Sequence, residues 1–148
     1  PHDAEPHGYE EFIATVDAIV IGRNTFEKVL SFEAWPYADK RVVVLSSRPV
    51  DFSTVKGGIV EQMAGAPAEI VSRLAGSGAR HLYVDGGITI QRFLSAGQVQ
   101  RLVVTRVPVL IGDGIPLFGP LPQDVRLRHV ATRHYPSGLV QSEYEVIV

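Results

Sequence analysis

The residues best suited to ligand chemistry lie in the stretch His81–Gly97, where an apolar strand pattern runs into two glycines and then a helical pattern. Paired glycines carry no Cβ and tolerate positive φ, so the backbone can turn sharply and approach a ligand closely. The first turn of the helix that follows presents unpaired N–H groups and the positive end of the helix dipole, and together these bind phosphate. We expect the following residues to line such a site: Asp85, Gly86, Gly87, Ile88 and Thr89. On this motif alone, an equally good interpretation is that the glycines only let the helix pack close to the sheet.

A second stretch, Ala18–Leu30, repeats the order of strand, glycine and helix. The apolar run before Gly22 predicts a buried strand, and Asn24 and Thr25 predict the cap of the helix that follows. Gly22 permits the turn and Arg23 supplies a planar cationic group. The two polar side chains, with the first helical N–H groups, would then hold phosphate oxygens. The alternative is that Asn24 or Thr25 only caps its own helix and that Arg23 is solvated.

A third stretch begins with the β-branched run Arg41–Ser46, which predicts a strand that is buried on both faces and parallel to its neighbours. Ser46, Ser47 and Arg48 stand at its carboxyl end. Two hydroxyls and a guanidinium make a suitable receptor for a phosphate monoester, and in an open α/β sheet ligands bind at this end of the strands. Taken by itself, the stretch is also typical of an ordinary turn with a surface arginine.

The rest of the pattern predicts the scaffold that positions these stretches. Pro108 predicts an edge position or a bulge in the long apolar run Arg101–Ile111, because proline cannot donate to a ladder. Alternating residues on both sides of 136–138 predict a C-terminal antiparallel hairpin. The expected strands cover residues 18–21, 41–46, 59–63, 82–84, 101–111, 126–135 and 139–148. The expected helices cover residues 9–15, 24–30, 67–74 and a segment after the paired glycines.

Composition narrows the class of protein. The chain has 148 residues, of which 45% are hydrophobic, and these values predict one compact domain, residues 1–148, with a continuous core. Its net charge of −2 argues against a nucleic-acid or anionic-membrane partner, because both need a basic face. No apolar run approaches the ~20 residues of a membrane span. The absence of cysteine excludes disulfides and thiolate metal sites and fits a cytoplasmic protein.

Spacing excludes several other kinds of site. The sequence contains no P-loop, no nucleophile-elbow serine and no H-E-x-x-H motif, and Pro116 breaks the helix that a dinucleotide fingerprint would need after Gly112 and Gly114. His129 and His134 lie an odd number of residues apart on one expected strand, so we expect them on opposite faces and predict no metal site. What remains is three anion-binding loops at the carboxyl ends of three strands. Together they suit a ligand with a central diphosphate and one further phosphate, which describes NADPH.

The same loops also carry a resemblance to a known family. The segments Val20–Glu27 (VIGRNTFE), Val44–Pro49 (VLSSRP) and Val84–Leu94 (VDGGITIQRFL), in that order, resemble the cofactor-binding segments of dihydrofolate reductase-like proteins. The segment Pro108–Phe118 is more similar to the reductase domain of bacterial bifunctional riboflavin-biosynthesis enzymes and its stand-alone relatives. The chain is therefore identified as a member of the dihydrofolate reductase-like family, with that reductase domain as the favoured subgroup.

The resemblance implies an α/β fold with a mostly parallel central sheet, helices on both faces and a C-terminal antiparallel hairpin. It also implies NADPH and hydride transfer to a small heterocyclic or carbonyl-type substrate. Such a reaction requires no protein nucleophile, because the cofactor supplies the hydride. Carried over by position, Gly22 to Thr25 and Gly86 to Thr89 would hold the diphosphate, and Ser46, Ser47 and Arg48 the adenosine 2′-phosphate. A homodimer is implied as well.

Two features depart from the pattern of that family. Dihydrofolate reductases carry a substrate-binding carboxylate early in the helix before VIGR, and the matching position here is Gly8, which argues against folate reduction. Glu10 and Glu11 are expected to be exposed first-turn residues. The family also begins with a strand that lines nicotinamide and substrate, and we expect that strand in a segment before Pro1. The alternatives to a riboflavin-type reductase are a nucleotide-binding module without turnover, a true dihydrofolate reductase and a purely structural α/β domain.

Overall fold

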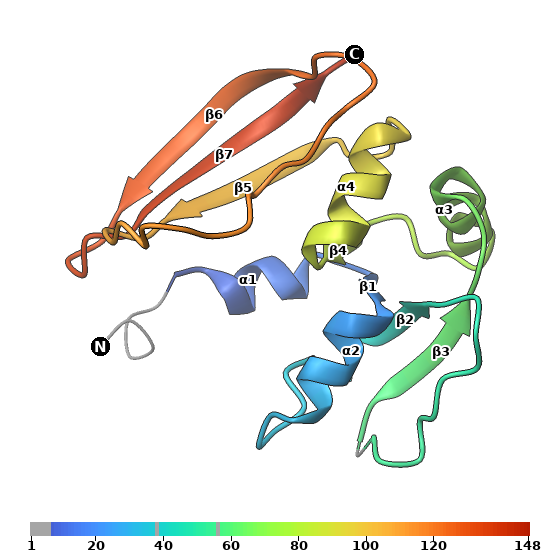
Figure 1. Ribbon diagram of the computed structural model, residues 1–148. Helices are drawn as coiled ribbons and strands as arrows, with labels where there is room; N and C mark the ends of the chain where they lie inside the picture. The colour runs from blue at the N-terminus through green and yellow to red at the C-terminus, as the bar shows by residue number, and fades with distance from the viewer. Residues whose placement is uncertain (1–6, 38, 56) are drawn as a thin grey trace.

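The structure is a computed structural model that describes residues 7–37, 39–55 and 57–148. Helices and strands alternate through most of the chain, and three strands end it (Figure 1). The elements are α1 (Tyr9–Ala14), β1 (Ala18–Gly22), α2 (Arg23–Leu30), β2 (Arg41–Leu45), β3 (Ile59–Met63), α3 (Pro67–Gly76), β4 (Leu82–Asp85), α4 (Gly87–Ser95), β5 (Arg101–Arg106), β6 (Arg126–His134) and β7 (Val140–Ile147). None of the described helices has the length and apolar character needed to cross a bilayer.

The first four strands form a parallel sheet in the order β3-β2-β1-β4. The residues Ala18–Ile21 of β1 and Val42–Val44 of β2 are fully buried, which explains why both strands are continuous apolar runs. The buried parallel strands predicted from the sequence are therefore confirmed. Because β2, β1 and β4 are neighbours, the three stretches with ligand chemistry follow adjacent strands at one edge of the sheet.

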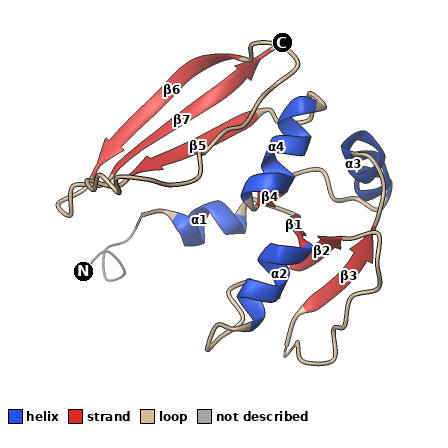
Figure 2. Ribbon diagram, viewed as in Figure 1, coloured by secondary structure: helices blue, strands red, loops and turns tan. Residues whose placement is uncertain are grey.

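Helices cover both faces of this sheet (Figure 2), as predicted. On one face, alternate strand residues such as Val20 and Val43 pack with α3 and α4 in a buried cluster that includes Ile70, Leu74 and Phe93. On the other face, the intervening residues such as Ile19 and Ile21 pack with Phe26 and Val29 of α2. This alternation is the side-chain period of a strand whose two faces are both dry.

The last three strands form a separate antiparallel sheet in the order β5-β7-β6. The predicted C-terminal hairpin is confirmed, and it consists of β6 and β7. Strand β5 pairs with the other edge of β7. The prediction of a strand as far as Ile111 is wrong, because β5 ends at Arg106. Arg106 pairs with Val140, the first residue of β7, so no partner lies beyond it, and Pro108 has no N–H to donate.

A bulge in β6 changes the expected placement of two histidines. The register of β6 against β7 shifts between His129 and Ala131. His129 pairs with Tyr144 and His134 with Val140, and these partners lie four residues apart on β7, so the two histidines share one face of the sheet. The prediction that they lie on opposite faces is wrong, because an extra residue in one strand reverses the alternation. The described residues contain no group of three or more side chains suited to a metal ion.

Candidate functional site

Two helices begin next to each other at the carboxyl edge of the parallel sheet, and neither has a side-chain cap. The N-cap of α2 is Gly22 and that of α4 is Gly86, and among the described residues no side chain caps either helix. The prediction that Asn24 and Thr25 cap α2 is wrong. Strand β1 continues to Gly22, and both polar residues already lie in the first helical turn. The N–H groups and dipole ends of both helices are therefore available to an anion.

The two helix starts are joined by a reciprocal contact between glycines and threonines. A Cβ added to Gly22 would lie 2.7 Å from Oγ1 of Thr89, in the first turn of α4. A Cβ added to Gly86 would lie 2.4 Å from Oγ1 of Thr25, in the first turn of α2. Each helix thus places its third residue where the N-cap of the other has no side chain. The two N-termini therefore lie directly against each other.

The stretch after β4 is divided between packing and an open side. Thr89 is only 5% exposed, so it packs between the helices and is not free to meet a ligand. A Cβ on Gly87 would meet nothing within 4 Å, and Ile88 is 72% exposed. Gly86 has a φ of 97°, which only glycine adopts easily. Of the two interpretations of these glycines, close packing accounts for Gly86, whereas Gly87 leaves the start of α4 open.

Arg23 connects the start of α2 to the loop after β2. Its Nη1 donates to the Ser46 hydroxyl at 3.4 Å and to the Pro49 carbonyl at 3.1 Å, and its Nε donates to Glu27 at 3.0 Å. The guanidinium is therefore not simply solvated, because it ties two of the three expected loops together. Nη2 makes no hydrogen bond within the described part of the chain, and it remains as a donor on this side.

Gln62 of β3 fixes the loop after β2, a role that the sequence does not predict. Its Nε2 donates to the carbonyls of Ser46 at 2.9 Å and Arg48 at 2.7 Å, and its Oε1 accepts from the N–H of Val50 at 3.0 Å. A lone glutamine in a short strand gives no signal of such a role. Only the register of β3 against β2, which pairs Gln62 with Val44, brings the amide to this loop.

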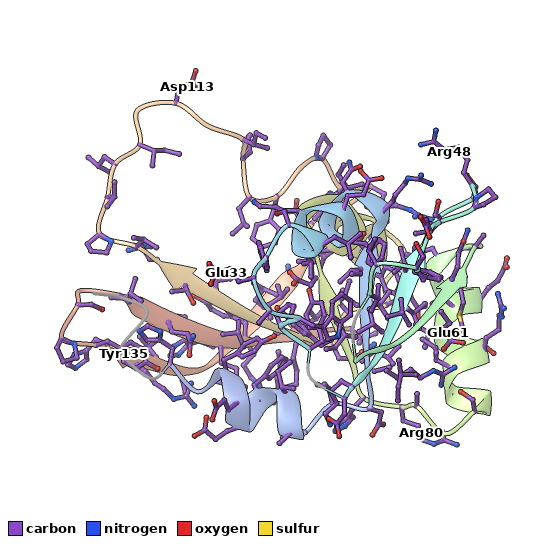
Figure 3. All side chains as sticks on the ribbon, turned by 90° about the horizontal axis from the view of Figure 1, so that it is seen from below. Glu33, Arg48, Glu61, Arg80, Asp113 and Tyr135 are labelled. Atoms are coloured by element: carbon purple, nitrogen blue, oxygen red, sulfur yellow. The ribbon has the colours of Figure 1, made fainter. Side chains whose placement is uncertain are left out.

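Within that loop the three predicted residues have different surroundings. The Ser46 hydroxyl donates to the Arg48 carbonyl at 2.8 Å and accepts from the Arg48 N–H at 3.2 Å, so it shapes the turn. Ser47 and the side chain of Arg48 are exposed, and Figure 3 shows Arg48 pointing away from the body of the molecule. Of the three predicted residues, Ser47 and Arg48 are therefore the two that are accessible to a ligand.

Asp85 turns its carboxylate toward a group of tyrosines. Oδ1 accepts the N–H of Gly86 at 2.8 Å, and Oδ2 accepts the hydroxyl of Tyr37 at 3.4 Å. Burial and the charge of Asp85 raise the pKa of Tyr37, Tyr83 and Tyr9. Asp85 is one of the residues predicted to line the phosphate site, but its carboxylate accepts hydrogen bonds from Tyr37 and from the N–H of Gly86.

Eleven of the twelve predicted residues thus surround one edge of the sheet as three adjoining loops, and Asp85 begins a neighbouring cluster. A family model described as the RibD C-terminal domain matches residues 7–141. The chain belongs to this family. The family is that of the reductase domain of riboflavin biosynthesis, so the suspected family is confirmed.

Solved structures agree with membership of the RibD C-terminal domain family. The chain is 33% identical to a protein from Shewanella sp. PV-4 named for riboflavin biosynthesis, with a TM-score of 0.91, and covers 84% of that structure with 100% of its own length. The chain is also similar to a diaminohydroxyphosphoribosylaminopyrimidine deaminase/5-amino-6-(5-phosphoribosylamino)uracil reductase from Thermotoga maritima. The two share 14% identity with a TM-score of 0.75, and the match covers 93% of this chain and 47% of that one. A third similar structure is the dihydrofolate reductase of Enterococcus faecalis complexed with NADP(H). It shares 20% identity with a TM-score of 0.60, and the match covers 93% of this chain and 79% of that one. The latter two show the fold alone, and they confirm the dihydrofolate reductase-like architecture.

Proposed function

We propose that this chain is an NADPH-dependent reductase that transfers a hydride to a small heterocyclic or carbonyl-type substrate, in the manner of the riboflavin-biosynthesis reductases. The observation that carries the proposal is the reciprocal contact of Gly22 with Thr89 and of Gly86 with Thr25. It brings two uncapped helix N-termini to one place, and a diphosphate carries its charge on two adjacent groups that suit such a pair. Family membership supports the reductase class.

In this proposal each loop has a separate task. The first N–H groups of α2 and α4 bind the diphosphate, with Asn24 and Arg23 Nη2 beside them. NADPH would supply the hydride. The chain's own task is to hold the nicotinamide and the substrate in contact and to exclude water between them.

Ser47 and Arg48 are the proposed receptor of the adenosine 2′-phosphate. Both are exposed on the loop that Gln62 fixes, and the guanidinium of Arg48 makes no hydrogen bond within the described residues. A guanidinium binds a phosphate monoester through paired, charge-assisted hydrogen bonds. This receptor would distinguish NADPH from NADH, which lacks the phosphate.

Titration of the protein with NADPH and NADH, followed by fluorescence and melting temperature, tests the proposal. We expect NADPH to bind more tightly and to raise the melting temperature by mass action. Arg48→Ala should weaken NADPH by about tenfold or more and leave NADH nearly unchanged, because a charge-assisted hydrogen bond is lost only with the phosphate. Arg80→Ala is a matched control, since Arg80 is also exposed but lies far from Arg48 in Figure 3.

Equal losses for the two cofactors in Arg48→Ala would contradict the assignment of the 2′-phosphate, and no binding of either cofactor would remove the proposal. Oxidation of NADPH in the presence of pterins, flavin precursors or quinones would then separate a reductase from a binding module without turnover. Folate is not the favoured substrate, because Gly8 occupies the expected carboxylate position and Glu10 and Glu11 are exposed.

We further propose that the protein is a homodimer. We also propose that it is cytoplasmic, because a chain without cysteine fits a reducing compartment.

A further inference from the structure

The loop after β2, residues 46–50, is held from two sides. On one side, the Gln62 amide of β3 bonds to three backbone groups of the loop at distances between 2.7 and 3.0 Å. On the other side, Nη1 of Arg23 on α2 donates to the Pro49 carbonyl at 3.1 Å and to the Ser46 hydroxyl at 3.4 Å. The form of this loop therefore depends on a side chain of α2 as well as on the neighbouring strand.

The Ser46 hydroxyl uses its whole capacity for hydrogen bonds inside the protein. It donates to the Arg48 carbonyl at 2.8 Å and accepts from the Arg48 N–H at 3.2 Å and from Arg23 at 3.4 Å. A hydroxyl has one donor and two acceptor sites, so none of them is left for a ligand. The bond from Arg23 is the longest of the three, and it depends on where the guanidinium is held.

Glu27 fixes the position of that guanidinium. It lies one helical turn after Arg23 on α2, and its Oε1 accepts from Nε of Arg23 at 3.0 Å. Because Nε and Nη1 belong to one rigid plane, the carboxylate on Nε directs Nη1 toward the loop after β2. The two side chains are 31% and 57% exposed, so the ion pair contributes little to the stability of the fold. Its main effect is on orientation.

We propose that Glu27 is a positioning residue that sets the preference of this site for a nucleotide with a ribose phosphate monoester. By holding Arg23 against the Pro49 carbonyl and the Ser46 hydroxyl, it keeps the exposed Arg48 in place to bind the phosphate. The inference rests on the proposed function, in which Ser47 and Arg48 distinguish NADPH from NADH. It adds a residue that touches neither cofactor.

Glu27 also carries a negative charge close to this site, and the charge acts in the opposite direction. NADPH has one phosphate more than NADH and is therefore the more negative of the two. Removal of the Glu27 charge by itself would strengthen the binding of both cofactors, and that of NADPH more. Loss of the position of Arg23 would instead weaken NADPH alone. The two roles thus change the ratio of the Kd values in opposite directions.

Glu27→Leu and Glu27→Gln together separate these roles. Both substitutions remove the charge, but glutamine keeps an oxygen that accepts from Nε of Arg23. Fluorescence titration measures the Kd of NADPH and of NADH for each protein. We expect Glu27→Leu to reduce the preference for NADPH by about threefold, because one hydrogen bond that orients the guanidinium is lost. Glu27→Gln should keep the preference within about twofold of the original value or raise it.

Glu33→Leu is the matched control. Glu33 is exposed and loses the same charge, but it lies apart from Arg48 in Figure 3. This substitution should leave the ratio of the two Kd values unchanged. The melting temperature of each variant without cofactor should stay close to that of the original protein, since an exposed ion pair of this kind stabilises a helix only weakly.

The outcomes separate this inference from the proposed function. If the original protein binds neither cofactor, or binds both equally, the proposed cofactor site falls and the inference falls with it. If the original protein prefers NADPH and Glu27→Leu leaves that preference unchanged or raises it, only the inference is overturned. An equal loss of preference in Glu27→Gln and Glu27→Leu would also overturn it, because the charge and not the hydrogen bond would then be responsible.

Discussion

Gly22 and Gly86 occupy equivalent positions at the starts of two helices, but they are required for different physical reasons. Gly22 has φ −83° and ψ 172°, a conformation open to any residue, so only the Oγ1 of Thr89 excludes a side chain there. Gly86 has φ 97° in addition to the contact with Thr25. A side chain in place of Gly22 would therefore only clash with Thr89, whereas a side chain in place of Gly86 would clash with Thr25 and also strain the backbone.

A double-mutant cycle with Gly22→Ala and Thr89→Ala tests the first of these reasons. We expect Gly22→Ala to lower the free energy of unfolding by about 1–3 kcal/mol, because Thr89 is buried and its β-branched side chain is stiff. Removal of Oγ1 in the double variant should recover most of that loss relative to Thr89→Ala alone. Urea unfolding of the four proteins measures the coupling. Strict additivity of the two changes would contradict the contact.

The corresponding cycle at Gly86 should behave differently. Gly86→Ala should cost about 1–3 kcal/mol of stability, and Thr25→Ala should recover little of it, because the positive φ remains strained with alanine. Weaker NADPH binding should accompany the change, since the turn that begins α4 would move. The same urea and cofactor titrations measure both effects. Full recovery in the double variant would show that space alone requires this glycine.

At the scale of elements, the site is produced by parallel strands that end side by side. The sequence predicted this arrangement, because three apolar strands each ran into a glycine or hydroxyl turn, and adjacent strands of a parallel sheet carry such turns on one edge. It did not predict how the turns contact one another. The pairs Gly22–Thr89 and Gly86–Thr25 are distant in sequence, although the spacing G-x-x-T in GRNT and GGIT was a signal that could have been used.

The wrong element boundaries have the same kind of cause. The start of α2, the end of β5 and the bulge at His129 all depend on a partner element that local pattern does not contain. Strand β5 stops where β7 begins to pair, and β6 bulges against β7, so both depend on long-range register. The hydroxyl of Tyr37 likewise reaches Asp85 from a loop, where periodicity gives no information about the direction of a side chain.

A substitution of Gln62 tests whether β3 fixes the loop that carries Arg48. Gln62→Leu removes three hydrogen bonds to residues of the loop and leaves the size of the side chain nearly unchanged. We expect NADPH binding to weaken by about threefold to tenfold, while NADH binding changes less, because only the proposed 2′-phosphate receptor lies on this loop. The measured quantity is the ratio of the two Kd values.

Gln141→Leu is the control for this test, since the Gln141 amide donates to the Thr105 hydroxyl at 3.3 Å in the antiparallel sheet, away from the loop after β2. This substitution should leave the ratio of the Kd values of NADPH and NADH as it is in the original protein. If Gln62→Leu has no greater effect than Gln141→Leu, the loop holds its form without the glutamine, and the preference for NADPH must arise elsewhere.

At the scale of the whole molecule, the antiparallel sheet is poorly covered within one chain. None of the described residues of β5, β6 and β7 belongs to either buried apolar cluster. Val103, Leu127 and Val130 on these strands are exposed, and so are Leu110 and Ile115 in the segment after β5. Exposed apolar side chains that are numerous in one half of a molecule are typical of a region that a second molecule covers.

We therefore expect the protein to be a dimer whose interface includes this half of the molecule. Sedimentation or light scattering at micromolar concentration should give twice the chain mass of 16.1 kDa. The double substitution Leu110→Glu and Ile115→Glu should shift the mass toward that of one chain. Both side chains are fully exposed in the single chain, and the interface of the expected dimer would bury the new charges. Ile59→Glu is the control, since Ile59 is exposed on β3 in the parallel sheet and should leave the mass unchanged. A single-chain mass for the original protein at every concentration would contradict the dimer, and dissociation by Ile59→Glu alone would move the interface to the other sheet.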